Sequence, residues 1–443
     1  MRKITPRRLL IVVTAATAVA LLLVATGALD RLAGDRSVSS RAVWSLITWW
    51  AVFCAVTLLV TACVRRPREM ALAAGTVLLM LVGTEVVLRP FDIDRTKPEF
   101  KGLKSSRYHH VYPANAEMLM GTVQGRSVTA RTNEDGLRTD MTLETFLRYK
   151  NRVVLLGDSF TLGVGVAQDR IVSSVLEREL RERMGGEDVA VLNAGVVSYS
   201  PLLERQQYRG IVRRYRPTLV LLMLDASDIG DDIRYAREVV PGEAPLHFDF
   251  PDQSAPRVHL AVYELARPVL GEIGRNLRYL YVQIVHGGSV EYDYYDFEVT
   301  VGGQVDRNRF FIYRHPLAQT RPFFETTLAL IADIAADVEA DGAAFLLVVL
   351  PRYHMWGGRE CPDNWEIAQG AYTTDDPHQF EFVRFFAEAG EGAGLDVFNL
   401  LPSFEATDRF PLVFPNDPHW NENGHAFVAE ELSAYLLERG LVR

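Results

Sequence analysis

Three long apolar segments lie in the first fifth of the chain. Residues 9–29 and 42–64 contain no charged residue, and residues 70–88 contain only Glu85. Each segment has about the 20 residues that a helix needs to cross the hydrocarbon core of a bilayer. The pattern predicts three transmembrane helices in a membrane anchor over residues 1–104, which ends in a charged stalk. A cleaved signal peptide that ends near residues 25–28 (ATGA) is an alternative for the first segment.

Basic residues suggest how this anchor is oriented. Lys and Arg gather in residues 2–8, before the first segment, and in residues 65–68, between the second and the third. The positive-inside rule places both clusters on the cytoplasmic face. With three spans, the remainder of the chain then lies on the other side, and a cleaved signal peptide leads to the same result. We therefore expect a multi-pass protein of the cytoplasmic membrane with a large extracytoplasmic domain.

Short apolar runs alternate with amphipathic stretches in this domain, residues 105–443. Because helical and extended segments alternate, the pattern predicts an α/β fold with a parallel sheet covered by helices on both faces. The alternation stops between about residues 233 and 318, which we interpret as a large insertion that forms a lid or a substrate wall. The pattern predicts strands at residues 153–156, 189–192, 219–224, 344–350 and 396–398, and helices at about 169–184, 201–215, 321–341, 379–391 and 422–439.

Charge and cysteine content exclude several functions. Residues 1–104 carry a net charge of +8, whereas the whole chain carries −9, so the large domain is acidic at −17. An acidic domain lacks the basic surface that nucleic-acid binding needs, so no nucleic acid is expected as a partner. Only Cys361 of the three cysteines lies outside the apolar segments, and no zinc-ligand spacing is present. We expect neither a metal nor another cofactor.

Polar clusters follow three of the predicted strands, and a fourth precedes the last predicted helix. They are residues 157–159 (GDS), 193–195 (NAG), 225–228 (DASD) and 417–419 (DPH). Ligands of open parallel sheets bind beyond the carboxyl ends of the strands, so these clusters are expected to meet. Together they contain the Ser, His and Asp that nucleophilic catalysis uses.

Ser159, His419 and Asp417 are the candidate catalytic residues. A serine hydroxyl becomes a nucleophile when a neighbouring base takes its proton, and histidine can be that base near neutral pH. A carboxylate then fixes the imidazole tautomer. Asp417 can do so locally, because it lies two residues before His419 across a proline that stiffens the turn. Alternatively, Ser159 is no more than the N-cap of a helix.

The oxyanion and substrate site has four candidates: Gly195, Ser227, Asn193 and Asp228. A glycine allows a backbone N–H to approach a developing oxyanion, and a serine hydroxyl can donate to one. For Asn193 the alternative is a role at a strand end. For Asp228 it is a structural carboxylate cluster with Asp232.

These clusters resemble a known family. Residues 153–165 (VVLLGDSFTLGVG) and 191–199 (VLNAGVVSY) look like the first two blocks of the SGNH, or GDSL-type, hydrolases. Residues 417–421 (DPHWN), followed by Gly424, look like the last block. The short Asp-x-His-Trp form is similar to the membrane-anchored branch that includes alginate-type O-acetyltransferases of the cell envelope. The resemblance implies a three-layer α/β/α flavodoxin-like fold and acyl-ester chemistry through an acyl-enzyme, with Gly195 at the oxyanion.

The third block departs from the family. It usually ends in Gly-x-Asn-Asp, and the Asn side chain donates to the oxyanion. Here residues 224–228 (LDASD) place Ser227 at that position. Serine is shorter, and loss of one oxyanion donor costs about 2.7–4 kcal/mol of transition-state stabilisation.

The sequence therefore predicts a membrane-anchored serine esterase or O-acyltransferase outside the cytoplasmic membrane. Its expected substrates are ester-linked acyl groups, above all acetyl, on envelope glycans or lipids. The expected partners are the lipid bilayer, the acylated glycan or lipid, and a membrane protein that donates the acyl group. A non-catalytic glycan-binding or assembly module of the same fold is the alternative, and a lipase or thioesterase is a third hypothesis.

Overall fold

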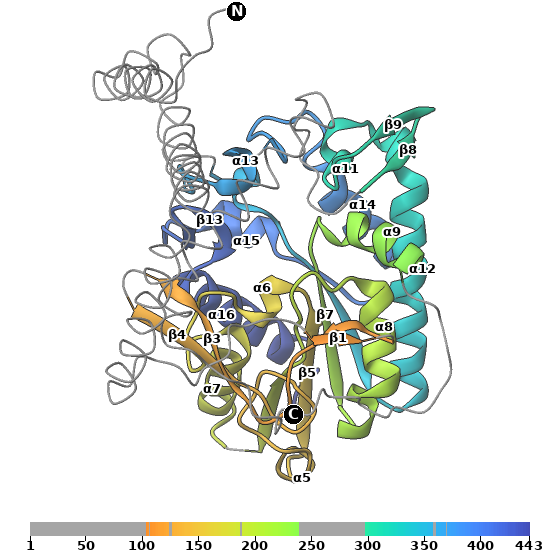
Figure 1. The fold of residues 1–443 in the computed structure, drawn as a ribbon. Coiled ribbons are helices and arrows are strands. Elements are labelled where there is room, and N and C mark those ends of the chain that lie inside the picture. The colour runs from red at the N-terminus through yellow and green to blue at the C-terminus, as the bar shows by residue number, and fades with distance from the viewer. Residues whose placement is uncertain are drawn as a thin grey trace, which may run out of the picture. The chain divides into compact units, whose positions relative to one another are not determined.

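Five parallel strands form the central sheet of the computed structural model (Figure 1). The sheet order is β11-β10-β7-β5-β6. The chain starts with β5, adds β6 on one side of it, and then adds β7, β10 and β11 on the other side. This is the flavodoxin-like order, in which ligands bind beyond the carboxyl ends of the strands at the reversal, here β5 and β7. The strands are β5 (Asn151–Gly157), β6 (Val189–Asn193), β7 (Leu219–Leu224), β10 (Ala344–Val349) and β11 (Val397–Asn399).

The structure describes residues 103–105, 107–123, 126–186, 188–238, 297–357, 360–368 and 370–443. The three predicted transmembrane segments and most of the predicted insertion lie outside these ranges, so both stay predictions. Within the described ranges, no helix is long and apolar enough to cross a bilayer.

Helices cover both faces of the sheet, which confirms the three-layer α/β/α arrangement of the described residues (Figure 1). Alternate side chains of a strand point to opposite faces. Val153 and Leu155 accordingly pack in the core beneath α7 and α16, whereas Val154 and Leu156 pack beneath α8 and α12. The long helices are α7 (Val172–Met184), α8 (Pro201–Gly210), α12 (Leu317–Ala340), α14 (Glu381–Gly392) and α16 (Glu422–Glu438).

Shorter elements connect this framework and complete it. The two-stranded hairpins are β1 (Leu103–Ser105) with β2 (His109–Val111), β3 (Glu117–Val123) with β4 (Arg126–Arg131), β8 (Val299–Val301) with β9 (Gln304–Asp306), and β12 (Val413–Phe414) with β13 (Asp417–Trp420). The remaining helices are α5 (Leu143–Phe146), α6 (Ser159–Leu162), α9 (Asp228–Glu238), α11 (Phe311–Arg314), α13 (Trp365–Ala368) and α15 (Leu401–Ala406), with single 3-10 turns at Val212–Tyr215 and Tyr353–Met355.

Two helix boundaries differ from the sequence prediction at the edges of the proposed insertion. Helix α9 continues to Glu238, although the sequence pattern indicates irregular structure from about residue 233. Helix α12 begins at Leu317 rather than near residue 321, and Pro322 lies inside it. Proline is typical of the first helical turn, so a proline in the second turn makes a helix look shorter than it is.

Truncation of Leu432 on α16 tests the packing of the outer layer. Leu432 is fully buried in the core between α16, α7 and the sheet. We expect Leu432→Ala to lower the free energy of unfolding by about 2–5 kcal/mol, because the truncation leaves a cavity. Denaturant titration followed by tryptophan fluorescence measures the change. Leu147→Ala, at a side chain with 39% exposure, is the control and should change the free energy by less than about 0.5 kcal/mol.

Candidate active site

Ser159 lies at the turn that joins the central strand β5 to the short helix α6. The N-cap of α6 is Asp158, whose side chain accepts a hydrogen bond from the Phe160 N–H at 2.8 Å. The alternative that Ser159 caps the helix is therefore wrong: Ser159 is the first helical residue. A side chain at Gly157 would come within 2.1 Å of the Thr161 hydroxyl. The turn is thus tight enough to need glycine, and it holds the half-buried Ser159 at the carboxyl edge of the sheet.

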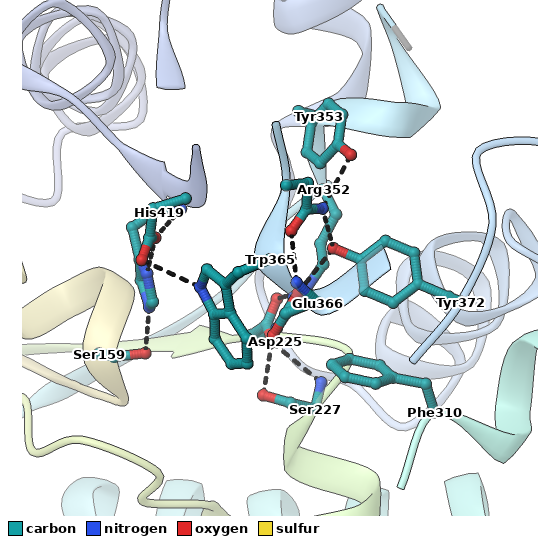
Figure 2. Close-up of polar contacts among 12 residues, drawn as sticks. Ser159, Asp225, Ser227, Phe310, Arg352, Tyr353, Trp365, Glu366, Tyr372 and His419 are labelled. Carbon is teal, nitrogen blue, oxygen red and sulfur yellow. Dashed lines mark hydrogen bonds and ion pairs between the residues drawn. The ribbon is translucent and has the colours of Figure 1, made fainter. Parts of the chain in front are cut away.

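The three candidate catalytic residues meet at this edge, where Figure 2 shows Ser159 beside His419. Ser159 Oγ lies 2.7 Å from His419 Nε2. His419 Nδ1 is hydrogen-bonded to Asp417 Oδ1, and the same oxygen accepts the His419 backbone N–H at 2.9 Å. A nucleophile, a base and an orienting carboxylate therefore form one hydrogen-bonded chain, which is the arrangement that activates a serine hydroxyl.

Strand geometry explains how a single intervening residue is enough. Asp417 and His419 lie on the short strand β13, where residues two apart point to the same side. Pro418 and Trp420 point to the other side and are buried. The expectation that Pro418 lies in a stiffened turn is corrected: it lies within the strand.

The electrostatic environment favours an ion pair between His419 and Asp417. Burial opposes ionisation of both groups. For Asp417, the positive charge of His419 and the hydrogen bonds that the carboxylate accepts outweigh burial and lower its pKa to about 2. For His419, the charge of Asp417 and the hydrogen bond to it outweigh burial and raise the imidazole pKa above 6.5. The imidazolium that forms when Ser159 loses its proton is therefore stabilised.

Trp365 completes the hydrogen bonding of Asp417. Its indole N–H donates to Asp417 Oδ2 at 3.1 Å, on the oxygen that His419 does not use. This role of Trp365 is not among the sequence predictions. A lone tryptophan more than 50 positions before the acid gives no local signal for the contact.

Asn193 and Gly195 support the nucleophile turn from the end of strand β6. Asn193 Nδ2 donates to the Thr161 carbonyl at 2.8 Å, and Asn193 Oδ1 accepts the Gly195 N–H at 2.9 Å. A side chain at Gly195 would come within 2.4 Å of the Leu162 backbone nitrogen. The expectation that Gly195 donates to the oxyanion is therefore corrected: its N–H is already used, and the glycine is needed for close packing against α6.

The backbone N–H of Ser198, unlike that of Gly195, has no acceptor among the described residues. From Ala194 to Tyr199, every backbone N–H except that of Ser198 donates to a described acceptor. Ser198 is half-buried and adopts a left-handed conformation with φ of 57°, which is uncommon for a residue other than glycine. The Val196 N–H bonds the Gly157 carbonyl at 3.0 Å, so this turn lies beside the nucleophile turn. The sequence gives no sign of this conformation, because serine, unlike glycine, seldom has a positive φ.

Ser227 lies at the end of β7 but its hydroxyl is engaged elsewhere. Ser227 Oγ donates to Asp225 Oδ2 at 2.6 Å, and the Ser227 N–H donates to the same oxygen at 2.9 Å. The side chain is buried, and Figure 2 draws it with Asp225, away from His419. The expectation that Ser227 replaces the family's Asn as an oxyanion donor is corrected, because Asp225 holds both of its donors.

Asp158, Asp225 and Asp228 form a fully buried carboxyl cluster behind Ser159, with one oxygen of each within 4.8 Å of the others. Both oxygens of Asp225 bind the Arg352 guanidinium. Asp228 Oδ2 accepts the Asp225 N–H at 2.9 Å, so Asp228 has a structural role at the start of α9. Burial and then Asp225 raise the pKa of Asp158 to about 7, and burial and then Asp158 raise that of Asp228 well above its usual range. The cluster suits shared protons better than a metal ion, because Arg352 already neutralises Asp225.

The described residues are similar in structure to solved esterases. One is the acetyl xylan esterase AlAXEase (13% identity, 64% of this chain, 99% of that chain, TM-score 0.34). Another is the psychrotrophic esterase EstA from Pseudoalteromonas sp. (12% identity, 65% of this chain, 97% of that chain, TM-score 0.33). A third is a catalytic mutant of the acetylxylan esterase Axe2 from Geobacillus stearothermophilus (12% identity, 67% of this chain, 97% of that chain, TM-score 0.34). No protein-family model and no curated protein matches the chain.

The raised pKa of His419 predicts a pH dependence. The base must be neutral to accept the Ser159 proton, so activity should fall as the pH drops through the His419 pKa, with a midpoint above 6.5. Asp417→Asn removes the charge that raises this pKa and should move the midpoint to lower pH while lowering the rate.

The measurement is the kcat/KM of aryl acetate hydrolysis from pH 5 to 9. Asp396→Asn is the control, because Asp396 pairs with Arg439 at the surface, and its midpoint should equal that of the wild type. An unchanged midpoint in Asp417→Asn would show that Asp417 does not set the pKa of His419.

Proposed function

We propose that this protein is a serine esterase or O-acyltransferase that works through an acyl-enzyme on Ser159. The observation that carries the proposal is the hydrogen-bonded chain from Ser159 through His419 to Asp417 at the carboxyl edge of the sheet. A nucleophile held 2.7 Å from a base whose other nitrogen is fixed by a carboxylate is poised for acyl transfer.

The reaction follows from these positions. Ser159 Oγ attacks the ester carbonyl carbon as His419 Nε2 takes its proton. The tetrahedral oxyanion forms near the N–H groups of Ser159 and Ser198, of which the first lies at the N-terminus of α6. His419 then returns the proton to the leaving alcohol as the carbon–oxygen bond breaks. Water or an acceptor hydroxyl, deprotonated by His419, attacks the acyl-enzyme and restores Ser159.

The acyl group and its location are proposed from the sequence. The apolar segments before residue 89 and the basic clusters beside them support a membrane anchor with the catalytic domain outside the cytoplasmic membrane. The Asp-x-His-Trp form over residues 417–420 supports acetyl groups on envelope glycans or lipids as substrates. Transfer rather than hydrolysis would need an acyl donor, and a membrane protein that supplies it is the proposed partner.

A non-catalytic glycan-binding module is the second candidate. It is favoured by Ser227, which occupies the position of the family's side-chain oxyanion donor but donates to Asp225. Without a side-chain donor, only backbone N–H groups remain to stabilise an oxyanion, and the rate enhancement would be smaller by the order of 10²–10³.

Substitution of Ser159 separates the two candidates. We expect the wild-type protein to hydrolyse an aryl acetate and to become labelled by a fluorophosphonate, because the probe needs an activated serine. Ser159→Ala should lose the labelling and lower kcat by at least about 10³-fold. Ser403→Ala, at a hydroxyl on α15 that donates to Glu431 on α16, is the matched control and should be labelled like the wild type. An unlabelled wild-type protein that still binds acylated glycan would support the binding module.

A further inference from the structure

The acid of the triad has a second partner that is itself firmly held. Asp417 Oδ2 accepts the indole N–H of Trp365 at 3.1 Å, and the Asp417 side chain is otherwise partly exposed. The two segments also pair through their backbones, since the Asp363 N–H bonds the Pro415 carbonyl at 3.0 Å and the Trp365 N–H bonds the Asn416 carbonyl at 3.4 Å. The indole therefore approaches Asp417 in one defined geometry.

The residue that follows Trp365 anchors it to the sheet. Glu366 Oε2 accepts Arg352 Nη1 at 2.7 Å and the Tyr372 hydroxyl at 2.6 Å. Arg352 also binds Asp225 through Nε at 3.0 Å and Nη2 at 2.6 Å. All four side chains are buried, so this ion pair cannot be exchanged for water without leaving an unpaired charge. The network fixes the start of α13 relative to the ends of β7 and β10.

Figure 2 shows the consequence: Trp365 lies between His419 on one side and the Arg352–Glu366–Asp225 group on the other. We infer that Trp365 is a positioning residue for the acyl-transfer reaction, held by the Arg352–Glu366 ion pair, that keeps Asp417 oriented toward His419. The inference rests on the proposed function and adds to it a residue that does not touch the reacting atoms.

A double-mutant cycle tests this role, with the second-order rate of inactivation by a fluorophosphonate as the readout. Trp365→Phe keeps a ring but removes the N–H donor. We expect it to react about 10-fold more slowly than the wild type, as the loss of a hydrogen bond to a charged group predicts. In an Asp417→Ala background, the same substitution should change the rate by less than about 2-fold, because the carboxylate that it orients is gone. With an aryl acetate, kcat should fall and KM should stay the same.

Tyr435→Phe is the matched control. Its hydroxyl also donates to a carboxylate, Asp396 Oδ1, at 3.2 Å, but that carboxylate is not part of the triad, so the inactivation rate should equal that of the wild type. Thermal unfolding of each variant establishes that it is folded. An equal rate for Trp365→Phe and wild type, or the same 10-fold loss in the Asp417→Ala background, would overturn the positioning role alone. A wild-type protein that fails to react would overturn the proposed function as well.

Discussion

The buried ion pair of Arg352 is the constraint on which the carboxyl edge of the sheet depends. A guanidinium with about 3% of its side chain exposed has to be paired with carboxylates, because an uncompensated buried charge is strongly destabilising. Asp225 at the end of β7 and Glu366 on α13 provide those carboxylates. The end of β7 and the Arg352 segment, which are 127 positions apart, are thereby held together with α13 at one point beside the nucleophile turn. The guanidinium also lies over the Phe310 ring, with its central carbon 4.7 Å from the ring centre.

The same ion pair explains why the third polar cluster does not act as its resemblance implies. Asp225 binds Arg352 through both oxygens, and one of these oxygens also accepts both donors of Ser227. Ser227 therefore supports a carboxylate that is needed for the ion pair and has no hydrogen left for a substrate. In this chain the end of β7 is structural, so the proposed oxyanion site has to use backbone donors. We propose the N–H groups of Ser159 and Ser198 for this role.

Local patterns were sufficient to predict the sheet strands and to predict that Ser159, His419 and Asp417 meet, because both depend on residues that are close in sequence or end at the same edge. The apolar run from Val153 to Leu156 predicts a buried strand by itself, and Asp417 and His419 lie in one short segment. The hydrogen-bond donors to the proposed oxyanion could not be assigned in the same way. Whether Gly195 or Ser198 has a free N–H depends on Asn193 folding back, and whether Ser227 is free depends on Arg352, 125 positions later. Long-range hydrogen bonds decide such questions, and a motif contains no information about them.

The short Asp-x-His spacing leaves the carboxylate on a short strand, and the rest of the site has to hold that carboxylate in place. Two residues on one face of β13 can bond to each other. Strand β13, however, is held by only two residue pairs with β12. Such a short hairpin is marginal alone, so the carboxylate needs a contact from outside the strand to stay in place. Trp365 supplies that contact with a flat, rigid donor whose position is set by the Arg352 ion pair. A long acid–histidine separation would let the fold place each residue independently. A short one couples both residues to a single strand, and the orientation of the acid then depends on the indole beside it.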